Sequence, residues 1–233
     1  MSVQLDYFAD GVGTAGKNLS HFAREPFASA ALAASEGSAG VYAQGIVDVR
    51  WRQHIACWAA KNGLGLEGDF VECGVNTGLM AMAVCKFLNI DKTDKKFYLF
   101  DTYEGIPIEQ LHVSEVKLAE SHNKLYYTNV YGKAKENFRP YKNTVMVKGI
   151  LPATLSEVNI EKVAYLSIDL NQVFAEKAVI EALWDKLSVG AMVLIDDYGF
   201  MGHDLQHKMW NEFAVKHDKY IASLPTGQGL IIK

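Results

Sequence analysis

The sequence predicts an α/β fold built on a mainly parallel sheet. Two observations predict it. Short apolar runs of strand length alternate with helical segments, and several of these runs end in an acidic residue followed by a turn. A chain of 233 residues, 49% of them hydrophobic and 21% charged, can form one such domain with a helical extension.

The segments before the first strand of the sheet are predicted to form a cap. Residues 1–20 are glycine-rich and are expected to be a flexible arm, or to become ordered against a partner. Residues 26–36 and 47–61 have helical patterns that stop at glycines, and should cover one edge of the sheet or the mouth of the site. The predicted division is therefore residues 1–64, an N-terminal arm and helical cap, and residues 65–233, the sheet domain.

The first strand–turn–helix unit carries the most informative pattern. An apolar run at residues 69–73 leads into the loop 74–78, which begins and ends with glycine, and then into a helical segment, 77–88. Ligands of open α/β sheets bind outside the carboxyl ends of the strands, where glycines allow close approach to the backbone and helix amides favour a negative group. This loop predicts a nucleotide-type cofactor site.

The rest of the chain continues the alternation. The predicted strands are residues 96–100, 144–148, 163–168, 191–195, 220–224 and 229–232, and the predicted helices are 130–138, 175–187 and 201–217. The polar stretch at about 105–130 is too long for a simple strand–helix loop, so we expect an inserted lid. The last two strands are joined by a hairpin turn, so one of them should run antiparallel.

Four of the predicted strands end in acidic residues: Glu72, Asp101, Asp169 and the pair Asp196-Asp197. A single such residue often only caps the following turn, but these strand ends should converge on one crevice. A carboxylate at Asp101 suits the two hydroxyls of a ribose. The glycine spacing G-x-x-x-G lacks the third glycine of a dinucleotide site, which favours S-adenosylmethionine over the alternative of an NAD-dependent oxidoreductase.

Three of these carboxylates, Asp169, Asp196 and Asp197, come from neighbouring strand ends. They would repel one another unless a cation lay between them. Oxygen ligands suit Mg²⁺ or Ca²⁺ better than Zn²⁺. The alternative is that Asp196-Asp197 only begins a turn and that no metal is present.

The motifs FVECGV at 70–75, FDTYEGIP at 100–107, VKG at 147–149, VLIDDYG at 193–199 and LPTGQGL at 224–230 together resemble those of the macrocin O-methyltransferase family. The resemblance implies a Rossmann-like, seven-stranded class I methyltransferase sheet over residues 65–233. It also implies S-adenosylmethionine, Mg²⁺ and methylation of sugar hydroxyls on natural products. By the same resemblance, Glu72, Gly74, Asp101 and Gly149 line the cofactor, and Asp169, Asp196 and Asp197 hold the metal.

The sequence departs from the family pattern after Asp169. A second acid is expected two residues on, where this chain has Asn171, and the lysine base of catechol-type enzymes is replaced by Gln172. Asn171 still offers a neutral oxygen. The departure leaves two alternatives open: a metal-independent methyltransferase acting on another nucleophile, or a cofactor-binding protein without turnover.

A histidine could supply the missing base. His203 follows the Asp196-Asp197 turn, and a neutral imidazole can accept a hydroxyl proton. His203 and His207 also form an H-D-x-x-H pattern, but the acid is shorter than the glutamate of zinc proteases and no third ligand is indicated. His112 and His122 in the lid could serve the same role, and the sequence does not distinguish them.

The predicted function is thus metal-assisted O-methylation of a hydroxylated small molecule, with in-line transfer of the methyl group favoured by proximity and orientation. The predicted catalytic residues are Asp169 and His203, and the metal ligands are Asp169, Asp196 and Asp197. The predicted cofactor-binding residues are Glu72, Gly74, Asn76, Thr77, Gly78, Asp101, Thr102, Gly149 and Asp169.

The composition of the chain limits the classes of partner and the cellular compartment that we expect. The formal charge of −4 and the lack of a basic run disfavour nucleic acid. The three cysteines lie in apolar segments and contain no C-x-x-C pair, which predicts free thiols in a reducing compartment. No signal peptide or membrane-length apolar run is evident, so the predicted location is cytoplasmic, without a membrane partner. The N-terminal arm leaves room for a homo-oligomer contact.

Overall fold

The computed structural model describes residues 4–41, 47–127 and 129–233. In this part of the chain a seven-stranded sheet has the order β5-β4-β3-β6-β7-β9-β8. Its strands are β3 (Asp69–Cys73), β4 (Phe97–Asp101), β5 (Thr144–Lys148), β6 (Val163–Ile168), β7 (Leu187–Ile195), β8 (Ala222–Ser223) and β9 (Gly229–Ile232). β3 pairs in parallel with both β4 and β6, and β9 is antiparallel to β7 and β8. The predicted α/β class and the closing hairpin are confirmed.

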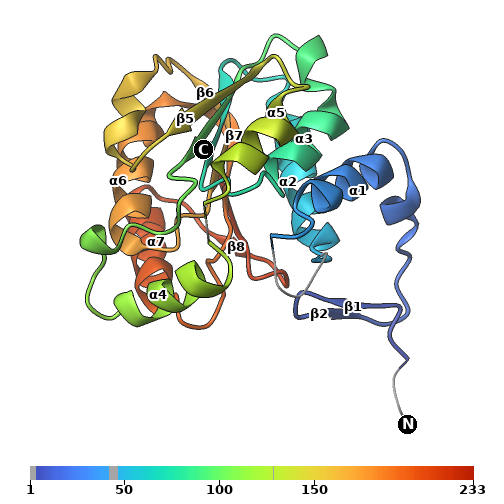
Figure 1. Ribbon diagram of the computed structural model, residues 1–233, viewed down its shortest axis with the longest axis horizontal. Helices are drawn as coiled ribbons and strands as arrows, with labels where there is room; N and C mark the ends of the chain where they lie inside the picture. The colour runs from blue at the N-terminus through green and yellow to red at the C-terminus, as the bar shows by residue number, and fades with distance from the viewer. Residues whose placement is uncertain (1–3, 42–46, 128) are drawn as a thin grey trace.

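Helices cover both faces of the sheet (Figure 1). One face carries α1 (Phe27–Gly37), α2 (Arg50–Gly63), α3 (Ala81–Leu88) and α5 (Tyr131–Phe138), and the other carries α6 (Val173–Leu183) and α7 (Asp204–Lys216). Alternate strand residues serve the two cores: Phe70 packs on the first side and Val71 on the second. Helices α1 and α2 share the first core with the sheet, so the division at residue 64 stays a prediction about organisation.

The N-terminal arm is more ordered than predicted. β1 (Tyr7–Ala9) and β2 (Val12–Thr14) form an antiparallel hairpin, followed by the 3₁₀ helix η1 (Ser20–Ala23). The turn residues Asp10 and Gly11 have φ values of 51° and 71°, the left-handed pair that an Asp-Gly turn favours. Residues 1–3 of the predicted arm, residues 42–46 before α2, and residue 128 of the predicted lid lie outside the described residues.

Several element boundaries differ from those predicted. The predicted helix at 77–88 begins only at Ala81, because Gly78 has φ of 98° and lies against the ring of Phe138. The predicted helix at 175–187 spans Val173–Leu183 and is followed by η5 (Trp184–Lys186), and β7 then starts at Leu187. The remaining short 3₁₀ helices are η2 (Ile90–Lys92), η3 (Ile108–Gln110) and η4 (Ala153–Glu157).

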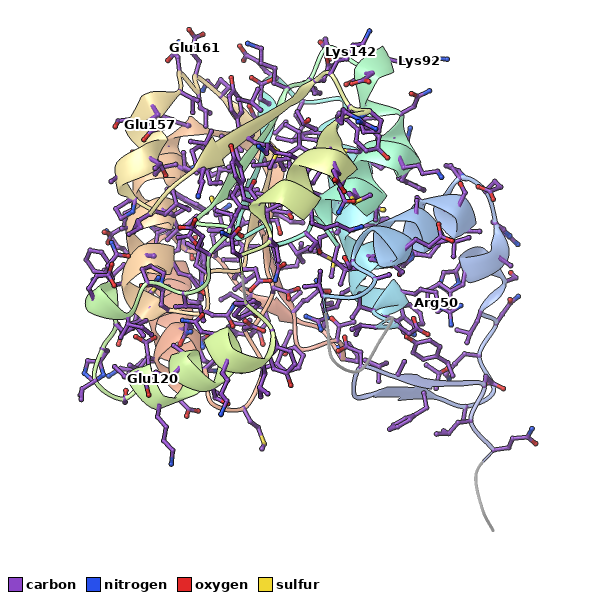
Figure 2. The ribbon with its side chains drawn as sticks, viewed as in Figure 1. Arg50, Lys92, Glu120, Lys142, Glu157 and Glu161 are labelled. Atoms are coloured by element: carbon purple, nitrogen blue, oxygen red, sulfur yellow. The ribbon has the colours of Figure 1, made fainter. Side chains whose placement is uncertain are left out.

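The predicted lid contains η3 and the helix α4 (Val116–Leu125). Buried Glu115 attaches it to the rest of the molecule: its Oε1 accepts a hydrogen bond from the backbone N–H of Val173, the first residue of α6, at 2.8 Å, and its Oε2 accepts one from the N–H of His112 at 3.0 Å. Asn123 holds the start of the lid through two hydrogen bonds to the backbone of Ile106. Glu120, by contrast, is exposed on α4 at the edge of the molecule (Figure 2).

Among the described residues, the length and hydropathy of every helix fall short of what crossing a membrane requires.

Candidate active site

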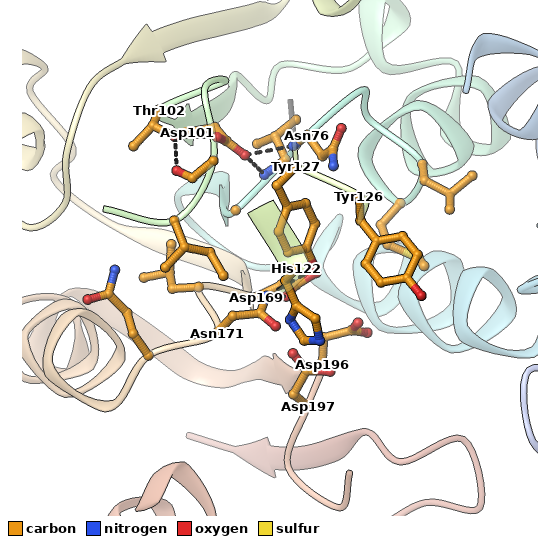
Figure 3. A pocket seen from close by; sticks show the side chains of 18 of the residues that line it. Asn76, Asp101, Thr102, His122, Tyr126, Tyr127, Asp169, Asn171, Asp196 and Asp197 are labelled. Atoms are coloured by element: carbon orange, nitrogen blue, oxygen red, sulfur yellow. Dashed lines mark hydrogen bonds between the residues drawn. The ribbon is translucent and has the colours of Figure 1, made fainter. Parts of the chain in front are cut away.

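A cavity of about 490 Å³ opens at the carboxyl ends of β3, β4, β6 and β7. β3 lies between β4 and β6, so this is the point where the strand order reverses and where open α/β sheets bind ligands. The walls come from the loop after β3, the lid, and the segments that follow β6 and β7. Figure 3 shows Asp101 and Asn76 at one end of the cavity, with His122 and the carboxylates of Asp169, Asp196 and Asp197 at the other.

Glycine is required where the loop after β3 meets the end of β6. Gly74 has φ of 89°, and a Cβ atom there would lie 1.7 Å from the carbonyl oxygen of Asp169. Gly149, with φ of 149°, closes the cavity after β5, and a Cβ atom there would lie 2.6 Å from Cγ2 of Thr154. Both glycines line the cavity, as does Asn76, so the predicted loop residues at these positions face the space a cofactor would use.

Asp101 lines the cavity and also fixes the shape of the loop. Its Oδ2 accepts hydrogen bonds from the backbone N–H groups of Val75 and Asn76 at 2.6 and 2.7 Å, and its Oδ1 accepts one from the N–H of Tyr103. Next to it, Thr102 lines the cavity while its hydroxyl donates to the carbonyl oxygen of Gly105 at 2.6 Å. The role of Asp101 toward a ribose stays a prediction. What the structure shows is a carboxylate that braces the loop.

Glu72 is a buried acid at the base of the cavity. Its Oε2 is buried without a hydrogen-bond partner among the described residues. Burial, and then the negative charge of Asp196, raise the pKa of Glu72 well above its usual range. A buried acceptor oxygen of this kind is costly unless a donor reaches it. The side chain therefore fits a cationic donor on a bound ligand.

The three predicted metal ligands do converge. Asp169, Asp196 and Asp197 all line the same end of the cavity. Burial and then the negative charge of Asp196 raise the pKa of Asp197 to about 7. The pKa of Asp169 is also raised, by burial and by Asp196 and Asp197. Its Oδ1 accepts a hydrogen bond of 2.7 Å from the amide of Asn171.

Asp196 is occupied by groups that the sequence did not indicate. Its Oδ2 accepts from Nη1 of Arg52 at 2.6 Å, and its Oδ1 accepts from Nε2 of Gln228 at 2.9 Å. Within the ranges that the structure describes, no group of three or more His, Cys, Asp or Glu side chains is arranged to hold a metal ion. No motif marked Arg52, which stands alone in a helical segment, and Gln228 belonged to the LPTGQGL motif without an assigned role.

The histidines that could serve as the base lie in different environments. His203 is buried in the cavity wall, with Nδ1 3.0 Å from Nε2 of Gln206 and Nε2 4.0 Å from Oδ2 of Asp197. Burial and the neighbouring His122 lower its pKa. His122 of the lid stacks on His203 with ring centroids 6.2 Å apart, and its Nδ1 is buried without a hydrogen-bond partner among the described residues. Exposed His112 instead bonds to Ser114 inside the lid.

The predicted cofactor residues Thr77 and Gly78, and the alternative zinc ligand His207, are not among the residues that line the cavity. Thr77 is buried, with its hydroxyl 2.7 Å from that of Ser38, and Gly78 packs against Phe138. Both shape the loop from behind. Nδ1 of His207 is 2.8 Å from the carbonyl oxygen of Tyr198, so its ring is engaged away from His203. This arrangement gives the H-D-x-x-H pattern no support as a zinc site.

Comparisons with known proteins agree with this geometry. The model of the family described as Macrocin-O-methyltransferase (TylF) matches residues 42–221. A curated relative, demethyldecarbamoylnovobiocin O-methyltransferase of Streptomyces niveus, is 27% identical over 143 residues, which span 58% of this chain and 55% of the relative. The match thus spans only about half the relative's length.

Solved structures share the fold. The O-methyltransferase NovP has a TM-score of 0.74 at 19% identity and covers 87% of this chain and 95% of its own. CalS11, a TDP-rhamnose 3′-O-methyltransferase of calicheamicin biosynthesis, has a TM-score of 0.54 at 15% identity, covering 78% of both chains. The S-adenosylhomocysteine (SAH)-bound methyltransferase PaMTH1 of Podospora anserina has a TM-score of 0.58 at 11% identity, covering 87% of both chains. The class I methyltransferase fold predicted from the motifs is confirmed.

Proposed function

The chain belongs to the macrocin O-methyltransferase family, and from this premise we propose that it transfers a methyl group from S-adenosylmethionine to a hydroxyl group of a sugar-bearing small molecule. The family match confirms the predicted enzyme class. The acceptor class is supported by the names of two similar proteins, a demethyldecarbamoylnovobiocin O-methyltransferase and a TDP-rhamnose 3′-O-methyltransferase. A cytoplasmic location and a homo-oligomer remain part of the proposal; the buried free thiols of Cys57, Cys73 and Cys85 support the former.

The observation that carries the proposal is the buried carboxylate of Glu72 in the cavity wall, whose Oε2 has no hydrogen-bond partner in the part of the chain that the structure describes. An amino-acid ammonium group, as carried by S-adenosylmethionine, is the kind of donor that this oxygen fits. Gly74, Asn76 and Gly149 offer backbone that a ligand can approach closely. When bound, the cofactor supplies an electrophilic methyl group attached to a sulfonium centre.

Other residues that line the cavity would exclude water, accept the hydroxyl proton and orient the acceptor. The lid contributes Ile106, Leu118, Tyr126 and Tyr127 to the wall, which excludes water from the reacting groups. His203 has a pKa lowered by burial, so its imidazole is neutral at physiological pH and can accept the proton of an acceptor hydroxyl. Asp169 lies at the same end of the cavity and orients the acceptor by hydrogen bonding.

The predicted Mg²⁺ is left out of this mechanism because the carboxylates in their present arrangement do not fit it. Both oxygens of Asp196 accept hydrogen bonds, one from the guanidinium of Arg52 and one from the amide of Gln228, and Oδ1 of Asp169 accepts one from the amide of Asn171. A divalent ion would have to displace these partners. No step above depends on a metal.

The test is methyl transfer from labelled S-adenosylmethionine to a panel of nucleotide sugars and glycosides, with and without chelator. The proposal expects methylation of a sugar hydroxyl, strongly reduced in His203→Asn while the affinity for SAH is kept. A second candidate is a cofactor-binding protein without turnover. It is favoured by Asn171, whose amide bonds to Asp169 where the family has an acid. Tight binding of SAH with no transfer to any acceptor would support that alternative.

A further inference from the structure

Arg52 of α2 is buried against the carboxylate cluster. Its Nη1 donates to Oδ2 of Asp196 at 2.6 Å, while Nε and Nη2 donate to the two carboxylate oxygens of Asp10 at 2.7 and 2.8 Å. The Arg52 side chain is only 17% exposed, and its guanidinium lies 5.4 Å from the centroid of the Phe200 ring. A planar guanidinium that donates from all three of its nitrogens is a specific structural group rather than a loose surface charge.

The position of Arg52 is set by a segment remote from the sheet. Asp10 sits at the tip of the β1–β2 hairpin, in the left-handed conformation that its turn requires. Arg52 lies in the first turn of α2, and Asp196 follows β7. The two ion pairs therefore connect the N-terminal hairpin to the carboxyl end of the sheet, and Asp10 and Arg52 both line the cavity.

Arg52 compensates negative charge in the cluster formed by the three aspartates. Asp169, Asp196 and Asp197 would carry three negative charges within one buried cluster, and such charges must be neutralised. Arg52 places one positive charge against Asp196, and it shares this charge with the carboxylate of Asp10. The amide of Gln228 fills the remaining oxygen of Asp196. A divalent cation would supply the same compensation, so Arg52 and a metal ion are competitors for Asp196.

We propose that Arg52 is the resident cation of this cluster: held by Asp10, it occupies Asp196 in place of a divalent metal ion, so that the cavity is organised without one. The inference rests on the proposed function only in taking this cavity as the site of methyl transfer. It assigns two positioning residues, Arg52 and Asp10, and it changes the expected metal dependence of the enzyme.

The experiment is a titration of MgCl₂ into the full-length protein, followed by calorimetry and thermal melting, for wild type and Arg52→Gln. The wild type is expected to show no saturable Mg²⁺ binding in the millimolar range and no rise in melting temperature. Arg52→Gln leaves the acidic cluster uncompensated, so it should melt lower than wild type. Mg²⁺ should restore much of this loss and bind roughly tenfold or more tightly than to wild type.

Arg50→Gln is the matched control. Arg50 lies two residues away on α2 and pairs with Asp48 at 2.8 Å, but it is 43% exposed, and it lies at the surface in Figure 2. It is absent from the cavity wall, so its replacement should leave the Mg²⁺ response as in wild type.

Two results would overturn the proposal: saturable Mg²⁺ binding by the wild type that is lost in Asp196→Asn, or an Arg52→Gln protein that folds but gains no Mg²⁺ response. The wild-type titration decides even if Arg52→Gln does not fold. Binding of SAH to the wild type, measured with and without chelator, separates this inference from the proposed function. If the protein does not bind SAH at all, the proposed methyltransferase function is contradicted. If it binds SAH with an affinity that chelator lowers, the function stands and the proposal that Arg52 replaces the metal ion is contradicted.

Discussion

Gly74 and Asp169 touch backbone to backbone: a Cβ atom on Gly74 would lie 1.7 Å from the carbonyl oxygen of Asp169. The N–H of Asp169 in turn donates to the carbonyl oxygen of Cys73 at 2.8 Å. The loop that would hold the cofactor and the strand end that begins the acidic cluster are thus fixed against each other at one point of the sheet. The two halves of the cavity share this contact.

Gly74→Ala should therefore be severely destabilising. The new methyl group would overlap a backbone atom that cannot move without breaking the β3–β6 pairing, and φ at this position is 89°. We expect a loss of more than about 3 kcal/mol in the free energy of unfolding, or no folded protein. Urea denaturation measures it. Gly132→Ala in α5, where no atom outside the helix among the described residues lies within 4 Å of the new Cβ, should instead gain up to about 1 kcal/mol. A mild effect at Gly74 would refute the close contact.

Glu72→Gln should separate cofactor binding from stability. The amide keeps the shape but removes the negative charge opposite a cationic ligand, so the affinity for SAH should fall by roughly 10- to 100-fold. Stability at neutral pH should not fall, because burial makes the ionised carboxylate unfavourable in the free protein. Calorimetry and thermal melting measure the two effects. An unchanged affinity would show that Glu72 does not face the ligand.

Glu115→Ala should release the lid. The truncation leaves the N–H groups of Val173 and His112 without their acceptors, at a cost of about 0.5–1.5 kcal/mol for each of these partly buried hydrogen bonds. Hydrogen exchange should accelerate over α4 and the first turn of α6, and KM for the acceptor should rise. Glu120→Ala, on the exposed side of the same helix, is the control. Equal exchange in the two variants would mean that Glu115 does not hold the lid.

Glu176, which lies outside the cavity wall, predicts a pH dependence of stability. It is buried between α6 and α7, accepts a hydrogen bond of 2.7 Å from Nε1 of Trp210, and burial raises its pKa to about 8. An acid whose pKa is raised on folding contributes stability that is complete below its unfolded pKa of 4.5 and is lost as pH rises through about 8. Wild-type melting temperature should therefore fall over this range.

Glu176→Gln should flatten this fall in melting temperature while keeping an acceptor for Trp210. Glu212→Gln, whose side chain is 68% exposed, should follow the wild-type curve. If the wild-type and Glu176→Gln curves remain parallel from about pH 5 to 8, the raised pKa of Glu176 is refuted.

Much of the fold could be predicted because local patterns and tertiary position agree. β5 and β6 begin and end at the predicted residues 144–148 and 163–168, since their apolar runs are bounded by turns. The N-terminal hairpin was missed although its Asp10-Gly11 turn is a recognised hairpin signal. Its strands have three residues each, too short for an alternating pattern to appear.

The cavity could be predicted in outline, but the partners of its side chains could not. Acidic residues at strand ends predict a shared crevice. This pattern located Glu72, Asp101 and the three carboxylates of Asp169, Asp196 and Asp197. Thr77 could not be separated from its neighbours by sequence, because its burial against Ser38 depends on α1. Arg52 bonds to residues 42 and 144 positions away, and no local pattern encodes such separations. The sequence therefore indicated the carboxylates and left their counter-charge unknown.

The measurement that tests the account most directly is calorimetric titration of the wild-type protein with SAH, with NAD⁺ as the control ligand. The account predicts saturable binding of SAH, no binding of NAD⁺, and a weakened affinity in Glu72→Gln. Absence of SAH binding, or binding that Glu72→Gln leaves unchanged while NAD⁺ also binds, would contradict the assignment of this cavity to S-adenosylmethionine.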